Sequence, residues 1–428
     1  MIPAALKDPG SLLELEEQFR SALLRAGAPM LAVLLQDRVD QIDADFQAGV
    51  HQVRMGRRRV RVDTLLGEVA IQRDYYYDER RHQGHCPSDA ALGLEGFCTP
   101  ALARLMCRAA AQQSYQEGSR DLAEYGGIQV DERQIQRVVL RIGPDVAPWL
   151  KEHAGSPQAV PVMYVSCDGT GAPMRPEELV GRKGRQPDGK ARTREVKLGA
   201  IFTQHTRDEK GRPIRDHDST TYVGGLDQAQ DFARLLREEG TRRGAGSARQ
   251  VIYLSDGAAW TEELQRQNFP GAVSILDFYH AAQRVHTLAD AIEFEEGAAK
   301  KRAAKWIKRL LKDGVGEVIA QARQALPRNR QKRSVATEQI TFLENHQKRM
   351  LYGTCRKKGW FIGSGVIEAG CKTVVGKRLK QSGMFWSEPG ASCVLQFRTL
   401  LLSRRFDLFW KDRQNHAAAR NDALALDA

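Results

Sequence analysis

Two acidic residues follow two apolar, strand-like segments, and their types and spacing are suited to chemistry. The segment "VMYVSCDGTG" (162–171) runs into Asp168 and then turns at Gly169, and "VIYLSDGAAW" (251–260) runs in the same way into Asp256. If the two strands are parallel neighbours, their carboxyl ends meet at one edge of a sheet and both carboxylates lie there. Like charges so placed repel unless a cation binds both, and hard oxygen ligands suit Mg²⁺ or Mn²⁺.

A third acidic residue, Glu368, is expected in the first turn of a helix that follows the segment "GSG" (363–365), with Lys372, Val375 and Leu379 on its face. Three carboxylates can hold two metal ions about 3.5–4 Å apart, which supports in-line phosphoryl transfer. Each acid also has a structural alternative, because Asp after a strand is often a turn former or helix cap and Glu stabilises a helix start. The repeated strand–Asp pattern favours the metal site.

The segment "DFYHA" (277–281) supplies a further pair, Asp277 and His280, where the next predicted strand ends and its helix begins. A histidine near a scissile phosphate can orient a strand or transfer a proton. The alternative is a helix cap beside a packed histidine.

Several strands and helices are predicted to position these groups. Apolar runs bounded by turn residues predict strands at 162–167, 196–204, 219–225, 250–255 and 272–276, and helices at 227–239, 258–267 and from 278 onward. Three strands followed by alternating helices and strands indicate a mixed sheet covered by helices.

The first part of the chain is predicted to be mainly helical. A capping box of Ser11 and Glu14 starts a helix that Gly27 should end; a second helix (30–46) and a β-hairpin with its turn near Gly67 follow. Three helices are expected between 99 and 142. The last two resemble a helix-turn-helix whose outward residues would read DNA, and the alternative is an ordinary three-helix bundle. These outward residues are Arg133, Gln134 and Arg137.

Changes in composition divide the chain into an α+β multi-domain arrangement. The expected segments are helices and hairpin at 1–98, the helix-turn-helix-like region at 99–152, the first part of the catalytic core at 160–292, a basic helical insertion at 293–355, the last part of the core with the acidic helix at 356–412, and a frayed tail at 413–428. A linker is expected at 153–161.

The charge balance favours a polyanionic partner. The 428 residues include 65 Lys or Arg against 53 Asp or Glu, a net charge of +12, which points first to nucleic acid, although a soluble basic protein is the simple alternative. Basic residues gather in three stretches that are expected to contact phosphates. These are Arg182, Lys183, Arg185, Lys190, Arg192, Arg194 and Lys197; Lys300, Lys301, Arg302, Lys305, Lys308 and Arg309; and Lys372, Lys377, Arg378 and Lys380.

The remaining composition argues against several classes of protein. Seven scattered cysteines without a CxxC pair argue against a disulfide framework and favour a reducing cytosol. The start of the chain does not have the pattern of a signal peptide, and no apolar run of 18 residues predicts a membrane span.

Four long motifs resemble the DDE transposase/integrase superfamily, and most closely insertion-sequence transposases of the ISKra type. They are "DGTGAPM" (168–174), "GRKGRQPDGKARTREVKLGAIFTQ" (181–204), "YLSDGAAW" (253–260) and "GSGVIEAGCKTVVGKRLKQSGMFWS" (363–387), within about 160–405 of the chain. The resemblance implies a ribonuclease-H-like core in which Asp168, Asp256 and Glu368 bind two Mg²⁺ or Mn²⁺ ions. Related Mutator-like transposases carry a pair similar to Asp277 and His280.

The same resemblance implies a bacterial, nucleoid-associated enzyme that acts on terminal inverted repeats and target DNA as a dimer or larger oligomer. Water would cleave the element ends, and the released 3′-OH would attack target DNA. Relatives often carry a Cys-rich patch where this chain has only His82, His85 and Cys86, so we predict no structural zinc. Two alternatives remain: a structure-specific nuclease or resolvase on the same fold, and an inactive, domesticated DNA-binding protein.

Overall fold

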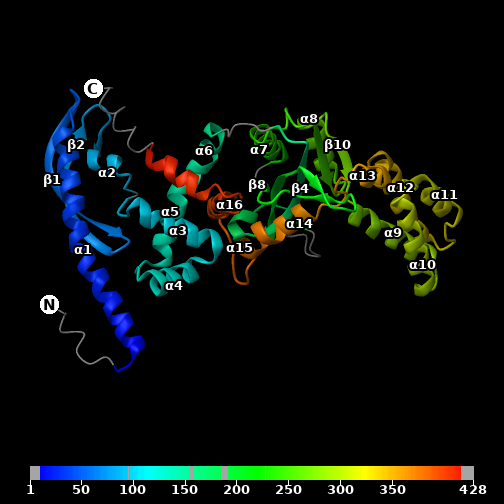
Figure 1. Cartoon of the computed structure of the whole chain (residues 1–428), viewed down its shortest axis with the longest axis horizontal. Helices are drawn as coiled ribbons and strands as arrows, with labels where there is room; N and C mark the ends of the chain where they lie inside the picture. Colours follow the sequence, from blue (N-terminus) through cyan, green and yellow to red (C-terminus); the bar gives the residue numbers. More distant parts are fainter. Residues whose placement is uncertain are drawn as a thin grey trace. The chain divides into compact units, whose positions relative to one another are not determined.

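The computed structural model describes residues 10–94, 96–153, 159–182, 184, 191–226 and 228–415 (Figure 1). The chain forms two compact units, Met1–Trp149 with Pro389–Ala428, and Leu150–Glu388. Most of the predicted linker, residues 154–158, and the end of the predicted tail, 416–428, lie outside the described residues. No described helix has both the length and the apolar character that a membrane crossing requires.

The first unit begins with one long helix instead of the two that were predicted. Helix α1 (Leu12–Asp45) starts at the predicted capping box of Ser11 and Glu14 and continues through Pro29. Gly27 does not end it, because this glycine packs against the hairpin: a Cβ there would lie 3.1 Å from Leu66 Cδ1. The predicted hairpin is confirmed as β1 (Gln52–Thr64) and β2 (Gly67–Asp78), with β3 (Gln83–His85) pairing to β2.

The three predicted helices between 99 and 142 are confirmed. After α2 (Pro87–Leu92) come α3 (Pro100–Gln112), α4 (Tyr115–Gly126), α5 (Glu132–Ile142) and α6 (Val146–Glu152). Gln134 does not face outward as predicted. Its side chain accepts a hydrogen bond from the Asp131 backbone N–H and donates one to Asp63, so it serves as part of the helix cap.

Helix α16 (Glu388–Leu402) packs with the first unit, although the sequence placed residues up to 412 in the catalytic core. Arg398 Nη1 donates a hydrogen bond to the Ala111 carbonyl at 2.6 Å. Gly143 approaches α16 so closely that a Cβ would lie 2.5 Å from Cys393 Cβ. The second unit therefore ends at Glu388.

The second unit is built on a mixed five-stranded sheet, as predicted. The strands are β4 (Val162–Pro173), β5 (Thr193–Gln204), β8 (Thr221–Gly225), β9 (Gln250–Ser255) and β10 (Val273–Leu276), in the order β10-β9-β4-β5-β8. Strand β4 is parallel to β9, and β9 to β10, whereas β5 is antiparallel to both β4 and β8. The short pair β6 (Thr206–Arg207) and β7 (Pro213–Ile214) forms a separate ribbon.

Helices cover the two faces of this sheet because alternate strand residues are apolar on both sides. On one face, Met163 and Tyr253 pack against α7 (Ala229–Arg242) and α8 (Ala259–Asn268). On the other, Tyr164 and Leu254 pack against α9 (Phe278–Ile292) and the predicted helical insertion. The insertion comprises α10 (Glu296–Leu310), α11 (Val315–Gln324) and α12 (Arg330–His346), followed by α13 (Tyr352–Lys357). The acidic segment follows as α14 (Gly365–Gly370), a π-helical turn (Cys371–Gly376) and α15 (Lys377–Leu379).

Candidate active site at the carboxyl edge of the sheet

Three aspartates occupy one row across the parallel strands of the sheet. Ser166 on β4 pairs with Leu254 on β9, so Asp168 and Asp256 stand at equivalent positions two residues further on. Leu276 on β10 pairs with Ser255, which places Asp277 beside Asp256 in the same register. The first and fourth strands are parallel neighbours, which is the condition stated above for the two carboxylates to share one edge, and the row includes Asp277 as well.

Asp168 lies within β4 and not at its end, contrary to the prediction. The chain does not turn at Gly169, because the long β5 continues to pair with β4 as far as Pro173, and Asp168 itself lies opposite Leu198. Strand β9 has already ended at Ser255. Asp168 therefore lies where β4 has lost its neighbour on one side.

The surroundings of Asp168 disfavour its negative charge in the absence of a cation. Burial raises the pKa of Asp168, and the neighbouring Asp256 carboxylate acts in the same direction. Hydrogen bonds from its own Gly169 N–H, at 2.7 Å, and from the Cys371 thiol, at 3.6 Å, only partly oppose these effects. Asp256 in turn accepts a hydrogen bond from the Ala258 N–H at 2.9 Å.

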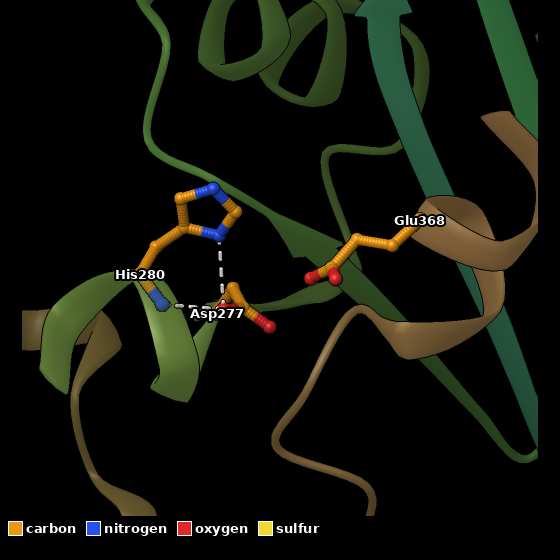
Figure 2. A group of neighbouring side chains, drawn as sticks. All are labelled: Asp277, His280 and Glu368. Atoms are coloured by element: carbon orange, nitrogen blue, oxygen red, sulfur yellow. Dashed lines mark hydrogen bonds and ion pairs between the residues drawn. The ribbon is translucent and has the colours of Figure 1, made fainter. Parts of the chain in front are cut away.

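Asp277 caps helix α9 and holds the ring of His280 (Figure 2). Its Oδ1 accepts hydrogen bonds from the His280 backbone N–H at 2.7 Å and from His280 Nδ1 at 3.0 Å, and its Oδ2 accepts one from the Ser364 N–H. Burial would raise the pKa of Asp277, but these hydrogen bonds lower it. The hydrogen bond to Asp277 raises the pKa of His280, and the charges of Asp256 and Glu368 add to this effect.

Glu368 points toward Asp277 and His280 from the start of α14 (Figure 2), and the Ser364 hydroxyl donates to its Oε1 at 3.0 Å. Within the described part of the chain, Asp277, His280 and Glu368 are the one set of three metal-ligating residue types whose ligand atoms all lie within 4.8 Å of one another. In the predicted triad of Asp168, Asp256 and Glu368, at least one pair of ligand atoms lies more than 4.8 Å apart. Asp277 is fully buried and its oxygens already accept three hydrogen bonds, so it positions His280 and Ser364.

The helix that carries Glu368 is less regular than predicted. At Cys371 it changes into the π-helical turn, which shifts the later residues around the axis. Lys372 is exposed, whereas Val375 and Leu379 are buried, so they do not share one face with Glu368. The irregular turn brings the Cys371 thiol to Asp168.

The sequence did not reveal several residues that support the site, namely Ser364, Cys371, His346 and Arg349. Arg349 follows α12 and donates a hydrogen bond to Ser255 Oγ at 2.6 Å, next to Asp256. It also pairs with Glu262 on α8, which binds His346 Nδ1 at 2.9 Å. Only the folded chain brings these residues together, since 94 positions separate Arg349 from Ser255.

We expect Arg349→Gln to destabilise the second unit by about 2 kcal/mol, because it breaks a largely buried charged contact, removes the donor to Ser255 Oγ and leaves Glu262 with His346 alone. Urea unfolding of the purified protein would measure this. The matched control is Arg266→Gln, which removes an exposed ion pair with Glu263 on the same helix α8 and should cost less than about 1 kcal/mol. Equal effects of the two changes would contradict the supporting role of Arg349.

Outside the helical insertion and Lys380, the predicted DNA contacts fall into three groups. Lys183, Arg185 and Lys190 lie outside the described residues. The side chains exposed to solvent are Arg182, Arg192, Lys372 and Lys377 in the second unit, and Arg133 and Arg137 in the first. The third group is buried and comprises Arg194, Lys197 and Arg378.

The three buried cations correct the prediction, because each contacts protein groups. Arg194 pairs with Glu388, and the Arg378 guanidinium lies 4.8 Å from the centre of the Trp386 ring. Lys197 pairs with Glu195 at 2.9 Å and lies over Trp260. Since Lys197 pairs with Gly169 in the register, it points to the sheet face opposite Asp168.

Comparisons with known proteins place the whole chain in a family. A solved structure, the Drosophila P element transposase strand transfer complex, is similar at 8% identity and a TM-score of 0.32, over 71% of this chain and 92% of that chain. None of the curated proteins matches the sequence. Residues 6–404 match the uncharacterised protein family UPF0236. Because this match spans nearly the full length, the chain belongs to the UPF0236 family.

Proposed function

We propose that the protein is a metal-dependent DNA transposase of an insertion sequence, with Asp168, Asp256 and Glu368 as its metal ligands. The observation that carries the proposal is the position of these acids. Two aspartates occupy equivalent places on adjacent parallel strands, and Glu368 on α14 lies beside Asp277, the third aspartate of the same row. Acids gathered in this way, in a chain with a net charge of +12, favour phosphoryl transfer on a polyanion.

We further propose that the second unit is a ribonuclease-H-like core. The sheet order supports this, because the first three strands form antiparallel neighbours and the fourth and fifth add in parallel on the other side of the first. In such a sheet the acids of the first and fourth strands lie at one edge, and the helix that carries the third acid packs beside them.

The donor set suits hard divalent cations. Carboxylate oxygens are the ligands preferred by Mg²⁺ and Mn²⁺. Burial and the neighbouring Asp256 raise the pKa of Asp168, so a cation bound there would favour its charged form. Two bound ions would polarise the phosphodiester and stabilise charge on the attacking and leaving oxygens. Asp168, Asp256 and Glu368 would hold these ions, and the Ser364 hydroxyl and Cys371 thiol contact two of the three carboxylates.

His280 has a separate role beside the ligands. Asp277 accepts a hydrogen bond from Nδ1 of His280, so Nε2 of His280 is the ring nitrogen that can contact other partners. The His280 side chain is 42% exposed. A histidine held in this way can donate to a phosphate oxygen of the scissile strand or carry its proton. Asp277 acts through His280 and is a positioning residue.

DNA would be held by exposed cations around the edge of the sheet and by the first unit. Arg182, Arg192, Lys372 and Lys377 are placed to contact phosphates, as are the lysines on the solvent face of α10. Arg133 and Arg137 on α5 are candidates for reading the terminal repeats. The proposal includes an oligomer on DNA in the bacterial nucleoid.

A cleavage and strand-transfer assay tests the proposal. The purified chain is incubated with Mg²⁺ or Mn²⁺, labelled DNA that carries the ends flanking its gene, and target DNA. We expect nicking at the ends and joining of the 3′-OH to target. Asp256→Asn and Glu368→Gln should bind the ends and do neither, whereas Asp290→Asn, an exposed acid on α9, should remain active.

Each other outcome has a defined meaning. Cutting without joining would overturn the transposase in favour of a nuclease or resolvase. Binding without cutting by the native chain would indicate an inactive DNA-binding protein. Full activity of Asp256→Asn or Glu368→Gln would remove that residue from the ligand set.

A further inference from the structure

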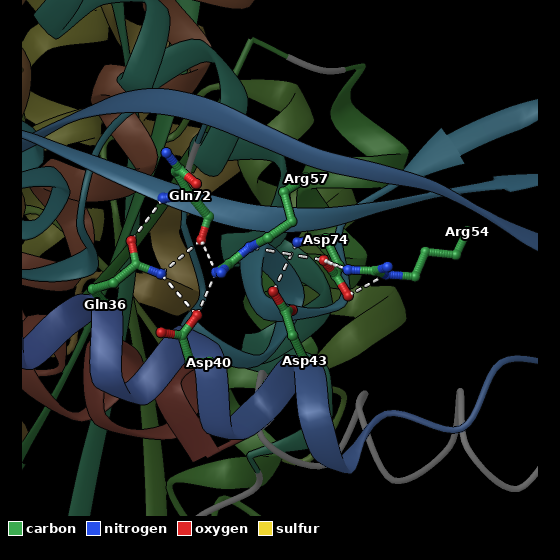
Figure 3. A network of polar contacts seen from close by, with 7 residues as sticks. All are labelled: Gln36, Asp40, Asp43, Arg54, Arg57, Gln72 and Asp74. Carbon is green, nitrogen blue, oxygen red and sulfur yellow. Dashed lines mark hydrogen bonds and ion pairs between the residues drawn. The ribbon is translucent and has the colours of Figure 1, made fainter.

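Helix α1 has two apolar faces, and the hairpin covers only one. On the inner face, Ala28, Ala32, Leu35 and Val39 pack with the buried valines of β1 and β2. Polar contacts between α1 and β2 hold this face against the hairpin (Figure 3). The Gln36 side chain donates to the Gln72 carbonyl at 2.8 Å and accepts from the Gln72 N–H at 2.7 Å. Asp43 accepts from the Asp74 N–H at 2.7 Å. The opposite face therefore points away from the hairpin.

That opposite face carries a continuous row of large apolar side chains, which we call the outer stripe. Its members recur every three to four residues, the spacing that places them on one side of a helix. They are Leu12 (71% exposed), Leu15 (37%), Phe19 (53%), Leu23 (58%), Met30 (69%), Val33 (61%) and Leu34 (66%). The small, exposed Ala26 lies between Leu23 and Met30 and completes the row near its middle.

The outer stripe is large enough for a stable contact. From Leu12 to Leu34 it extends over about 33 Å at 1.5 Å per residue. Burying one such side chain removes roughly 60–120 Å² of apolar surface, so the seven together offer several hundred Å² per copy. This is comparable to the largest apolar patches on monomers and approaches the roughly 800 Å² per partner of a standard interface.

The arrangement along the outer stripe matches a second copy of itself in the reverse direction. With a two-fold axis at Leu23, Leu12 of one copy lies opposite Leu34 of the other. The bulky Phe19 lies beside the small Ala26 of the other copy. Such an isologous contact uses the same patch on both subunits, and the ring fits where a small side chain leaves room.

Charge selects the antiparallel direction. Glu16 is the one charged side chain within the outer stripe between its two ends. In a parallel pair, Glu16 would face its own copy and the two carboxylates would repel. In the antiparallel pair it lies opposite Met30, at the edge of the contact.

We propose that two copies of this chain associate through the outer stripes of their α1 helices, packed antiparallel about Leu23. This does not depend on the proposed catalytic function, because the interface contains no residue of the sheet edge and requires neither DNA nor metal.

Sedimentation velocity of the full chain over a range of concentrations tests the association. We expect a dimer for the native protein and at least a tenfold weaker dimer for Leu23→Glu, which places two carboxylates on the two-fold axis. Leu23 is mostly exposed in one copy, so the fold should tolerate the change, and circular dichroism would verify this. Ser21→Glu adds the same charge at an exposed position on the other side of α1 and should still dimerise. A monomeric native protein, or equal loss in both variants, would overturn the proposal.

Cysteine cross-linking tests the direction. Under mild oxidation Leu23→Cys should form a covalent dimer, because residue 23 faces its own copy across the axis. Leu12→Cys alone should not, whereas Leu12→Cys combined with Leu34→Cys should. The native chain under the same oxidant measures the background from its own cysteines. Cross-linking by Leu12→Cys alone would overturn the antiparallel arrangement, and no cross-linking in any variant would overturn the interface.

Discussion

Asp168→Asn is expected to lower the rate of metal-dependent DNA cleavage by at least about a thousandfold, and to raise the melting temperature of the metal-free protein. A bound metal supplies several kcal/mol of charge stabilisation in the transition state, and each 1.36 kcal/mol corresponds to a factor of ten. Loss of a carboxylate ligand removes much of this transition-state stabilisation. The amide has nearly the same shape, so the fold and DNA binding should be retained.

The gain in stability follows from the charge of the site. Burial and the nearby Asp256 raise the pKa of Asp168 above its ordinary value of 3.8. The folded protein therefore holds the Asp168 proton more tightly than the unfolded chain does. The contribution of Asp168 to stability is therefore fully present below about pH 4 and is lost as the pH rises through the raised pKa. Asparagine carries no charge, so this loss is absent in the variant.

Differential scanning fluorimetry in EDTA and in Mg²⁺ would measure the stability, and a labelled-end assay would measure the activity. Mg²⁺ should raise the melting temperature of the native protein more than that of Asp168→Asn. Asp290→Asn should behave as the native chain in both experiments. A variant that is less stable in EDTA and still cleaves DNA would show that Asp168 is a structural residue and not a metal ligand.

The sequence predicted the local parts of this site well, because local patterns set them. Apolar runs ending in Asp168 and Asp256 identified two strands, and the capping box of Ser11 and Glu14 identified a helix start. The pairing of β4 with β5 beyond Asp168 was not visible, because strand length depends on the partner strand and not on the local pattern. Gly27 was misjudged for a similar reason, since its close contact with Leu66 lies across the fold.

Long-range contacts account for the rest. Asp277 was expected as a catalytic group, and it is fully buried, with a hydrogen bond from the N–H of Ser364, 87 residues further on. The burial of Arg194 and Arg378 could not be predicted either, because a basic residue is rarely buried unless a partner meets it across the fold. Glu388 and Trp386 are those partners. A run of positive charge in the sequence therefore overstates the surface that DNA can reach.

Asp277→Asn is expected to destabilise the protein by about 2–3 kcal/mol at neutral pH. The native carboxylate accepts three hydrogen bonds in a fully buried position. The amide group of asparagine has one oxygen, so at least one buried N–H of His280 or Ser364 loses its acceptor, which costs about 1–3 kcal/mol. These hydrogen bonds lower the pKa of Asp277 despite its burial. Their contribution is present above about pH 4 and is lost as the pH falls through the lowered pKa.

The same substitution should lower the pKa of His280 and reduce cleavage about 10–100-fold, the range typical for residues that orient an active group. The hydrogen bond to Asp277 is the main cause of the raised pKa of His280, so its loss is directly measurable by NMR titration of ¹³C-histidine-labelled protein. Urea unfolding between pH 3 and 8 would give the stability, with the difference from the native chain shrinking below pH 4. Asp290→Asn on the exposed side of α9 is the control for all three measurements. An unchanged pKa of His280 in Asp277→Asn, together with reduced cleavage, would mean that Asp277 itself meets the metal or the DNA, and the assignment of Asp277 as a positioning residue would be wrong.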